Sequence, residues 1–125
     1  MAVNRKVNAV SYPAGGDLSA SQYCIVYMSD EGRVTVNGAG GATACLGILL
    51  NKPTAVDQAA RVAIDGSIVK CIAGGAVAER AWVMAAASGH GTSATTDNGY
   101  CVGRAHSAAA ASATLFEVLV DTGRY

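Results

Sequence analysis

Hydrophobic positions along this chain fall into short runs that are separated by glycine-rich or polar turns. Residues 22–28 and 43–50 are almost continuously apolar, whereas residues 33–37 alternate between apolar and polar positions. Short apolar runs bounded by turn residues are typical of buried strands, and alternation is typical of half-buried ones. The pattern predicts an all-β fold, a single small β-barrel or β-sandwich domain of about eight or nine short strands.

Two turn signals predict hairpins. The segment SDEG at 29–32 lies between two predicted strands and suits a hairpin loop. Asp65-Gly66 is the strongest turn signal, because Asp-Gly readily takes the positive φ angles of a type I′ turn. It predicts that residues 67–73 return beside the segment 56–64, which alternates with period two, although its beginning is also compatible with a helical turn.

The second half of the chain is rich in alanine and glycine. The segment 82–87 predicts a strand, and residues 88–99 predict a long polar loop of small side chains. The last strands are expected at 100–105 and 114–121, with a small-residue connection between them.

A division into two regions follows: an extended N-terminal arm at 1–20 and a β-rich domain at 21–125. Gly47 interrupts an apolar run and indicates a bulge or a close approach of two backbones. The segments CLGILLN (45–51) and CVGRAHS (101–107) echo each other faintly, without forming a repeat array. The residues expected to anchor the core are Tyr23, Ile25, Leu46, Ile48, Val62, Ile64, Trp82, Leu115 and Val118.

The charge content is low and balanced. The 125 residues include nine basic and nine acidic side chains, so the formal net charge is zero and charged residues make up 14%. The absence of a basic excess argues against a nucleic-acid partner. A weakly charged surface near neutrality favours self-association, and we expect other subunits to cover part of it; the alternative is an alanine-rich domain that stands alone.

Nothing in the sequence predicts a membrane segment or a signal peptide. No apolar run reaches the length of about 18 residues that a membrane helix needs. The first apolar residues are interrupted by Asn4, Arg5, Lys6 and Asn8, which excludes the apolar core of a signal peptide. We therefore expect no membrane partner and a protein that stays in the cytosol where it is made.

Residues that could carry chemistry are scattered. Cys24, Cys45, Cys71 and Cys101 form no CxxC pair and are expected to be reduced, buried and apolar in character, with a disulfide as the alternative. His90 and His106 lack metal-binding spacing, and no serine stands in a G-x-S-x-G elbow. Glu117 is expected on the solvent or interface face of its strand, paired with an arginine. The sequence thus predicts no catalytic residue, no metal ligand, no cofactor and no small-molecule substrate.

The stretch 43–121 resembles the small capsid cement, or head decoration, proteins of tailed bacteriophages. The resemblance rests on CLGILLNKPTA, on ARVAIDGSIVKCIAGGAVAERAWVMAAASG and on NGYCVGRAHSAAAASATLFEVLVD. The N-terminal segment VNRKVNAVSYPAGGDLSASQ is similar to the extended beginning of these proteins. One departure is ERA at 79–81, where members often have Gly-Asp, and it puts the local loop geometry in question.

The resemblance implies a β-rich structural protein of the virion without an active site, and not an enzyme. It implies a homotrimer that binds the major capsid protein on the outer surface of the head and stabilises the shell by bridging coat subunits. Alternation at the N-terminus suits strand addition to an exposed edge of the coat protein, the alternative being a disordered terminus. The residues expected to contact the capsid are Val3, Asn4, Arg5, Lys6 and Val7.

Other functions remain open at this stage. The segment 66–84 is also similar to carrier modules that hold biotin or lipoyl groups on a lysine at an exposed hairpin tip. Lys70 lies in mid-strand and Lys52 precedes a proline, so neither fits that position well. A phage tail or fibre component shares the structural class, and a small hydrolase is disfavoured by the missing catalytic constellation.

Overall fold

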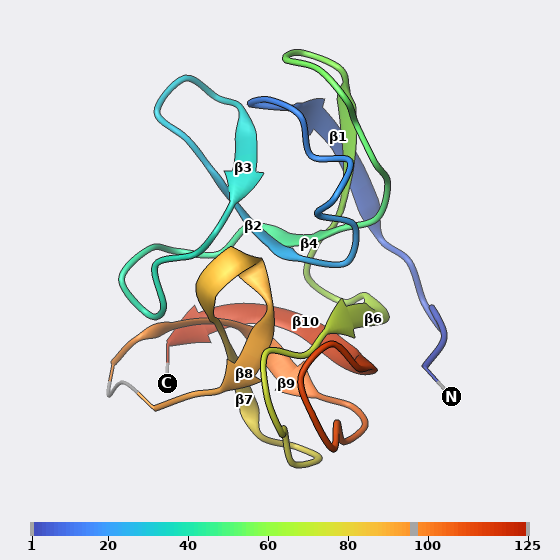
Figure 1. Ribbon diagram of the computed structural model, residues 1–125, viewed down its shortest axis with the longest axis vertical. Helices are drawn as coiled ribbons and strands as arrows, with labels where there is room; N and C mark the ends of the chain where they lie inside the picture. Colours follow the sequence, from blue (N-terminus) through green and yellow to red (C-terminus); the bar gives the residue numbers. More distant parts are fainter. Residues whose placement is uncertain (1, 96–97, 125) are drawn as a thin grey trace.

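The computed structural model describes residues 2–95 and 98–124, and these residues form two five-stranded antiparallel sheets (Figure 1). The all-β prediction is confirmed. The first sheet contains β1 (Ala9–Pro13), β2 (Ile25–Met28), β3 (Val34–Val36), β4 (Gly47–Leu49) and β5 (Ala59–Ala63). The second contains β6 (Ile68–Ile72), β7 (Trp82–Ala85), β8 (Gly91–Ser93), β9 (Tyr100–Ala105) and β10 (Leu115–Arg124), with the short 3-10 turn η1 (Ala87–Gly89) between β7 and β8.

The two sheets repeat one topology. The first has the strand order β1-β5-β4-β2-β3, and the second has β6-β10-β9-β7-β8, so each strand has a counterpart five strands later. An isolated parallel bridge joins the edges of each sheet, Ala14 to Val34 in the first and Ala73 to Gly91 in the second. Each sheet therefore curls until its edge strands meet. We name the two halves the first unit (residues 9–64) and the second unit (residues 68–124).

Local backbone features repeat as well. Tyr23 has a φ of 67° and Arg80 a φ of 72°, in the left-handed region that side chains rarely occupy. Each donates its backbone N–H to the last residue of an equivalent strand, Tyr23 to the carbonyl of Leu49 on β4 at 2.7 Å and Arg80 to that of Ala105 on β9 at 2.8 Å. A second matched pair is Asp57 and Ala113, whose N–H groups donate to Ala14 and Ala73 at 2.8 Å each.

Two glycines explain the faint echo between the halves. A Cβ atom on Gly47 would lie 2.0 Å from the carbonyl oxygen of Ala63, and one on Gly103 would lie 2.0 Å from that of Leu119. Only glycine allows the neighbouring strand to approach so closely. The close backbone approach predicted at Gly47 is confirmed, and it occurs at the equivalent place in both units.

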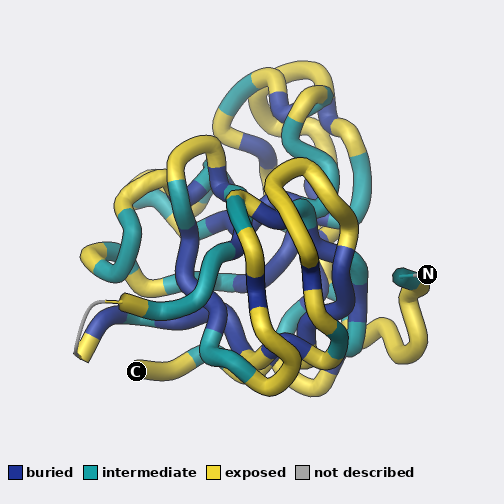
Figure 2. The backbone as a smooth tube through the Cα atoms, turned by 60° about the horizontal axis from the view of Figure 1, so that its bottom comes forward, coloured by how far each residue is buried: buried dark blue, intermediate teal, exposed yellow. Residues whose placement is uncertain are grey.

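The buried hydrophobic side chains form two clusters, and Figure 2 shows the buried positions along the backbone. One lies inside the first unit and includes Val26, Leu49 and Val62. The other fills the second unit around Phe116, and it also includes Ile25 and Ile48 from the first unit. The first unit therefore buries an outer face against the second, and this contact joins the two halves.

Most predicted core anchors lie in or beside these clusters. Ile25, Ile48, Val62 and Val118 are fully buried, as predicted. Four others are half-buried: Tyr23, Leu46, Ile64 and Trp82. Leu115 was wrongly predicted as an anchor, since it is 41% exposed. Strand alternation puts Phe116 and Val118 inside and turns Leu115 outward.

The hairpin predicted at Asp65-Gly66 is wrong. Both edges of β5 are occupied, by β1 and β4, so the following strand β6 cannot return beside it and pairs with β10 instead. The turn connects the two sheets. Gly66 has a positive φ of 93° and donates its N–H to the carbonyl of Val120 at 2.9 Å.

The long loop predicted at 88–99 is also partly wrong, because it contains β8, which pairs with β7. Its sequence Gly-Thr-Ser carries no apolar alternation, which is why the strand escaped detection. Two residues of that segment, Thr96 and Asp97, lie outside the described residues. The hairpin predicted at 29–32 is confirmed as the pairing of β2 with β3.

Candidate interaction surfaces

The beginning of the predicted arm packs along the free edge of β6 (Figure 1). Arg5 donates its backbone N–H to the carbonyl of Ile68 at 2.8 Å, and Ile68 donates back to Lys6 at 2.8 Å. The amide oxygen of Asn4 accepts the N–H of Lys70 at 2.9 Å. The segment 3–8 thus lies beside β6, joined to it by one isolated bridge and these hydrogen bonds, and β1 then joins the first sheet. The boundary at residue 20 stays a prediction.

A buried carboxylate holds this segment in place. Glu117 is 1% exposed, although it lies on the outward side of β10. Its two oxygens accept the Nε–H of Arg5 at 2.8 Å and the backbone N–H of Val3 at 3.0 Å. The predicted pairing with an arginine is confirmed. Of the expected solvent or interface face, the solvent alternative is wrong, because the N-terminal segment of the same chain covers the carboxylate.

The same contacts shift the titration of Glu117. The hydrogen bond from Arg5 is the largest cause that lowers the pKa of this carboxyl, and the N–H of Val3 and the charges of Arg5 and His106 add to it against the cost of burial. A carboxyl with a lowered pKa stabilises the docked segment above its unfolded pKa. That contribution is lost as the pH falls through the lowered value.

We therefore expect acid to release the N-terminal segment before the sheets unfold. The replacement Glu117→Gln removes the ionised acceptor and should weaken docking by about 1–3 kcal/mol at neutral pH. Hydrogen exchange at the amides of Lys6 and Ile68 measures this release. In the wild type the protection should fall on acidification, and in Glu117→Gln it should be low at every pH. Equal protection in both proteins at neutral pH would contradict the anchoring role.

The five residues predicted to contact the capsid lie together on this segment. Val3 and Val7 are 38% and 43% exposed, and the Arg5 side chain is exposed while it binds Glu117. Among residues 2–95 and 98–124, the backbone N–H groups of Asn4 and Val7 donate to no other backbone group. The outer side of the segment therefore has an open edge with two apolar side chains.

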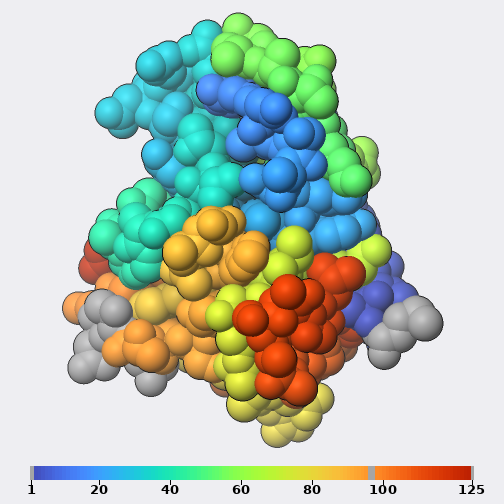
Figure 3. Space-filling view, in the orientation of Figure 1, coloured from blue at the N-terminus to red at the C-terminus, as the bar shows by residue number. Residues whose placement is uncertain are grey.

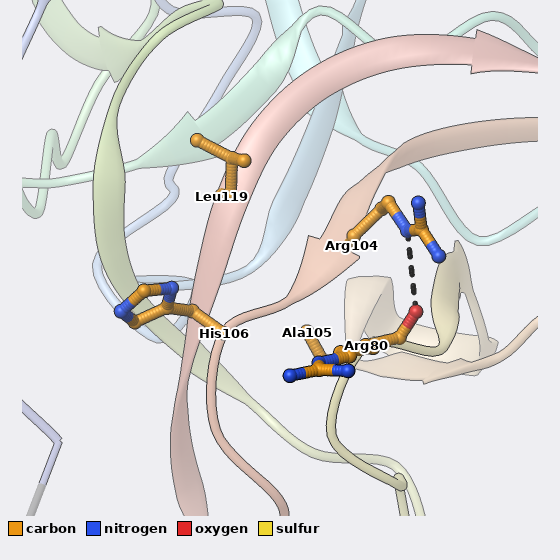
Figure 4. A pocket seen from close by; sticks show the side chains of 5 residues that line it. All are labelled: Arg80, Arg104, Ala105, His106 and Leu119. Carbon is orange, nitrogen blue, oxygen red and sulfur yellow. Dashed lines mark hydrogen bonds between the residues drawn. The ribbon is translucent and has the colours of Figure 1, made fainter.

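A second surface lies on the outer face of the second unit. Trp82, Arg104 and Leu119 stand opposite one another on β7, β9 and β10. The guanidinium of Arg104 lies 5.0 Å from the centre of the Trp82 ring, and its Nε–H donates to the carbonyl of Arg80 at 3.2 Å. Arg80, Arg104, Ala105, His106 and Leu119 line an open cavity of about 230 Å³ (Figure 4).

No catalytic or metal-binding arrangement emerges within the described ranges. No group of three or more His, Cys, Asp or Glu side chains there is placed to hold a metal ion. All four cysteines are free thiols. Burial raises the pKa of Cys45 to about 12, and burial likewise raises that of Cys71, so both thiols stay protonated. Lys70 lies in mid-strand with its Nζ 4.6 Å from the centre of the Tyr23 ring, not at a hairpin tip.

The fold and these surfaces define a class: a small all-β protein built from two similar five-stranded units, with exposed apolar and cationic faces. No protein-family model matches the chain, and no curated protein matches it either. In the part of the chain that the structure describes, no helix has the length and apolar character needed to cross a membrane.

Proposed function

We propose that this protein is a structural component of a tailed-phage virion, which binds the outer surface of the capsid as a trimer and stabilises the head by bridging coat subunits. The observation that carries the proposal is the open edge of the N-terminal segment. Among the described residues, the backbone N–H groups of Asn4 and Val7 on this edge donate to no other backbone group. The side chains of Val3 and Val7 are exposed beside them. A strand of the coat protein that adds to this edge would gain main-chain hydrogen bonds and bury both valines.

The anchored state of the segment favours such binding. Because Glu117 and β6 already hold residues 3–6, a partner strand meets an ordered edge and little chain entropy is lost on association. Several copies of one modest contact on a trimer would add as avidity. The proposal needs no cofactor and no substrate; the partners are the major capsid protein and further copies of this chain.

The exposed valines provide the test. In the double variant Val3→Asp/Val7→Asp, we expect co-sedimentation with expanded heads of the phage that encodes the chain to weaken by about tenfold or more, because two charges would have to be buried. Thermal stability should stay close to wild type, since both side chains are exposed. Val10→Asp on β1 is a matched control, because Val10 is 39% exposed and lies outside the contact set.

If a folded Val3→Asp/Val7→Asp protein binds heads as well as the wild type does, the N-terminal segment is not the capsid contact. Wild-type protein that does not sediment with heads at all would overturn the proposed function itself. The point variants are preferable to deleting the segment, because a deletion would also expose the Glu117 carboxylate and the edge of β6.

A further inference from the structure

Because the two units share one topology, each has an equivalent outer sheet face, but one of these faces is covered and the other is open. In each unit one row of three residues crosses the sheet on its outer side. In the first unit the row is Ile25, Ile48 and Ala63, and in the second it is Trp82, Arg104 and Leu119. The first row is fully buried inside the shared core, whereas Leu119 is 36% exposed and Arg104 is exposed. One copy of this face is therefore covered and the other is open.

The second unit covers the row of the first unit with two of its segments. Gly89, in the connection between β7 and β8, approaches so closely that a Cβ atom there would lie 2.9 Å from the carbonyl oxygen of Ile25 and 2.6 Å from a methyl carbon of Val36. From β6, Ile72 donates its N–H to the carbonyl of Tyr23 at 3.1 Å. The connection between β7 and β8 is thus one of the segments that dock.

The first unit has an equivalent connection, and this connection does not dock against the second unit. It is the turn between β2 and β3, residues 29–33, which lies at the far end of the molecule from the second unit (Figures 1 and 3). Asp30 and Glu31 are exposed there, and Arg33 binds Glu31 and Asp57. The two carboxylates of the turn against one guanidinium give it a net negative charge, and Asp57, from the connection before β5, adds a third carboxylate beside Arg33.

The cavity on the open face of the second unit is lined by two arginines and no carboxylate. Arg80, Arg104 and His106 take the places of Tyr23, Ile48 and Leu50 in the covered copy. Within the described ranges neither Arg80 nor Arg104 takes part in an ion pair. The nearby Glu117 is already bound by Arg5 and Val3. Figure 4 shows Arg80, His106 and Leu119 around the cavity, with Arg104 turned onto the carbonyl of Arg80.

We propose that a second copy of this chain docks the turn 29–33 onto the Trp82–Arg104–Leu119 face, and so repeats between chains the contact that joins the two units within one chain. Charge complementarity identifies the partner as a second copy, because Asp30 and Glu31 of the turn would meet Arg80 and Arg104 of the face. In the contact within one chain, apolar side chains pack at the equivalent positions. The contact is heterologous, because it joins two different surfaces. Repeated copies therefore form a closed ring if the rotation between neighbouring subunits adds up to a full turn. This inference rests on the self-association included in the proposed function, and not on capsid binding.

Two variants separate the faces. Arg80→Glu/Arg104→Glu disables the cationic face, and Asp30→Asn/Glu31→Gln disables the acidic turn by neutralising it, so that the two disabled faces do not attract each other. Light scattering of the wild type should show an oligomer, and each variant alone should associate at least about tenfold more weakly. Arg61→Glu reverses one arginine charge at an exposed site on β5 of the first unit and should leave the oligomer intact. Thermal melting checks that each variant is folded.

Mixing the two disabled proteins is the decisive measurement. Each retains one intact face, so the mixture should form a one-to-one dimer that cannot grow further. A wild-type protein that stays monomeric, or an associating wild type whose disabled variants give no mixed dimer, would overturn the inference. Head binding is scored separately: a mixed dimer from a protein that ignores heads would uphold the inference while the proposed function fails.

Discussion

Replacing Gly103 with alanine should destabilise the protein by about 3 kcal/mol or more, beyond the usual cost of one added methyl group in a packed core. The new Cβ would lie 2.0 Å from the carbonyl oxygen of Leu119 and 2.9 Å from the backbone N of Asp121. Both atoms belong to the backbone of β10, which cannot rotate away as a side chain could. Strand β10 would have to move, and its pairing with β9 and β6 would weaken together.

Gly47→Ala should have an effect of the same kind in the first unit, because its Cβ would lie 2.0 Å from the carbonyl oxygen of Ala63. Gly123→Ala is the matched control, since nothing lies within 4 Å of a Cβ atom there and its φ is not positive. Urea unfolding measures the free energies, and the control should change by less than about 0.5 kcal/mol. A Gly103→Ala protein as stable as Gly123→Ala would contradict this account of the glycine.

The fold class was predictable because strand signals are local. Segments 22–28, 33–37 and 100–105 carry apolar runs or alternation, and each contains an observed strand. The pairing of strands is not local. An Asp-Gly turn has the same chemistry whether the next strand returns to the same sheet or crosses to another, so Asp65-Gly66 could not reveal that β1 and β4 already occupy both edges of β5.

The similarity of the two units is hardly visible in the sequence, because the two units share their backbone conformation more than their side chains. Gly47 and Gly103 are retained, since any other residue would clash with the next strand. At Tyr23 and Arg80 the left-handed backbone and its hydrogen bond persist while the side chain differs. Outer-face positions are free to diverge because one copy is buried and the other is open to solvent.

The residues of the N-terminal contact segment could be predicted from the sequence, but the contacts that hold the segment in place could not. Alternating apolar and polar positions marked the segment 3–7, and a mid-strand acid marked Glu117. Nothing in the sequence shows that Arg5 and Glu117 meet, because 112 positions separate them. The cationic face was missed altogether: Arg104 and His106 lie two residues apart at the end of β9, but Arg80 comes from the turn before β7, and only the pairing of β7 with β9 brings it to the same cavity.

The replacement Phe116→Ala should cost about 3–5 kcal/mol, which is the range for truncating a buried aromatic side chain. Phe116 is the only phenylalanine of the chain and is 1% exposed. Its ring spans the second unit from β10 to β8, where its Cζ lies 3.2 Å from the Cβ position of Gly91. The equivalent position in the first unit is Ala60, and there the aromatic side chain comes from the opposite residue, Tyr12 of β1.

Leu115→Ala is the neighbouring control, because Leu115 is 41% exposed and its truncation should cost less than about 1 kcal/mol. The shape of the transition carries further information. Ile25 and Ile48 of the first unit belong to the same cluster as Phe116, so loss of the second unit uncovers an apolar face of the first. Denaturation of Phe116→Ala followed by tryptophan fluorescence and by circular dichroism should therefore give one coincident transition at lower urea. Two separated transitions would show that the units unfold independently, and a Leu115→Ala loss as large as that of Phe116→Ala would contradict the assignment of the core.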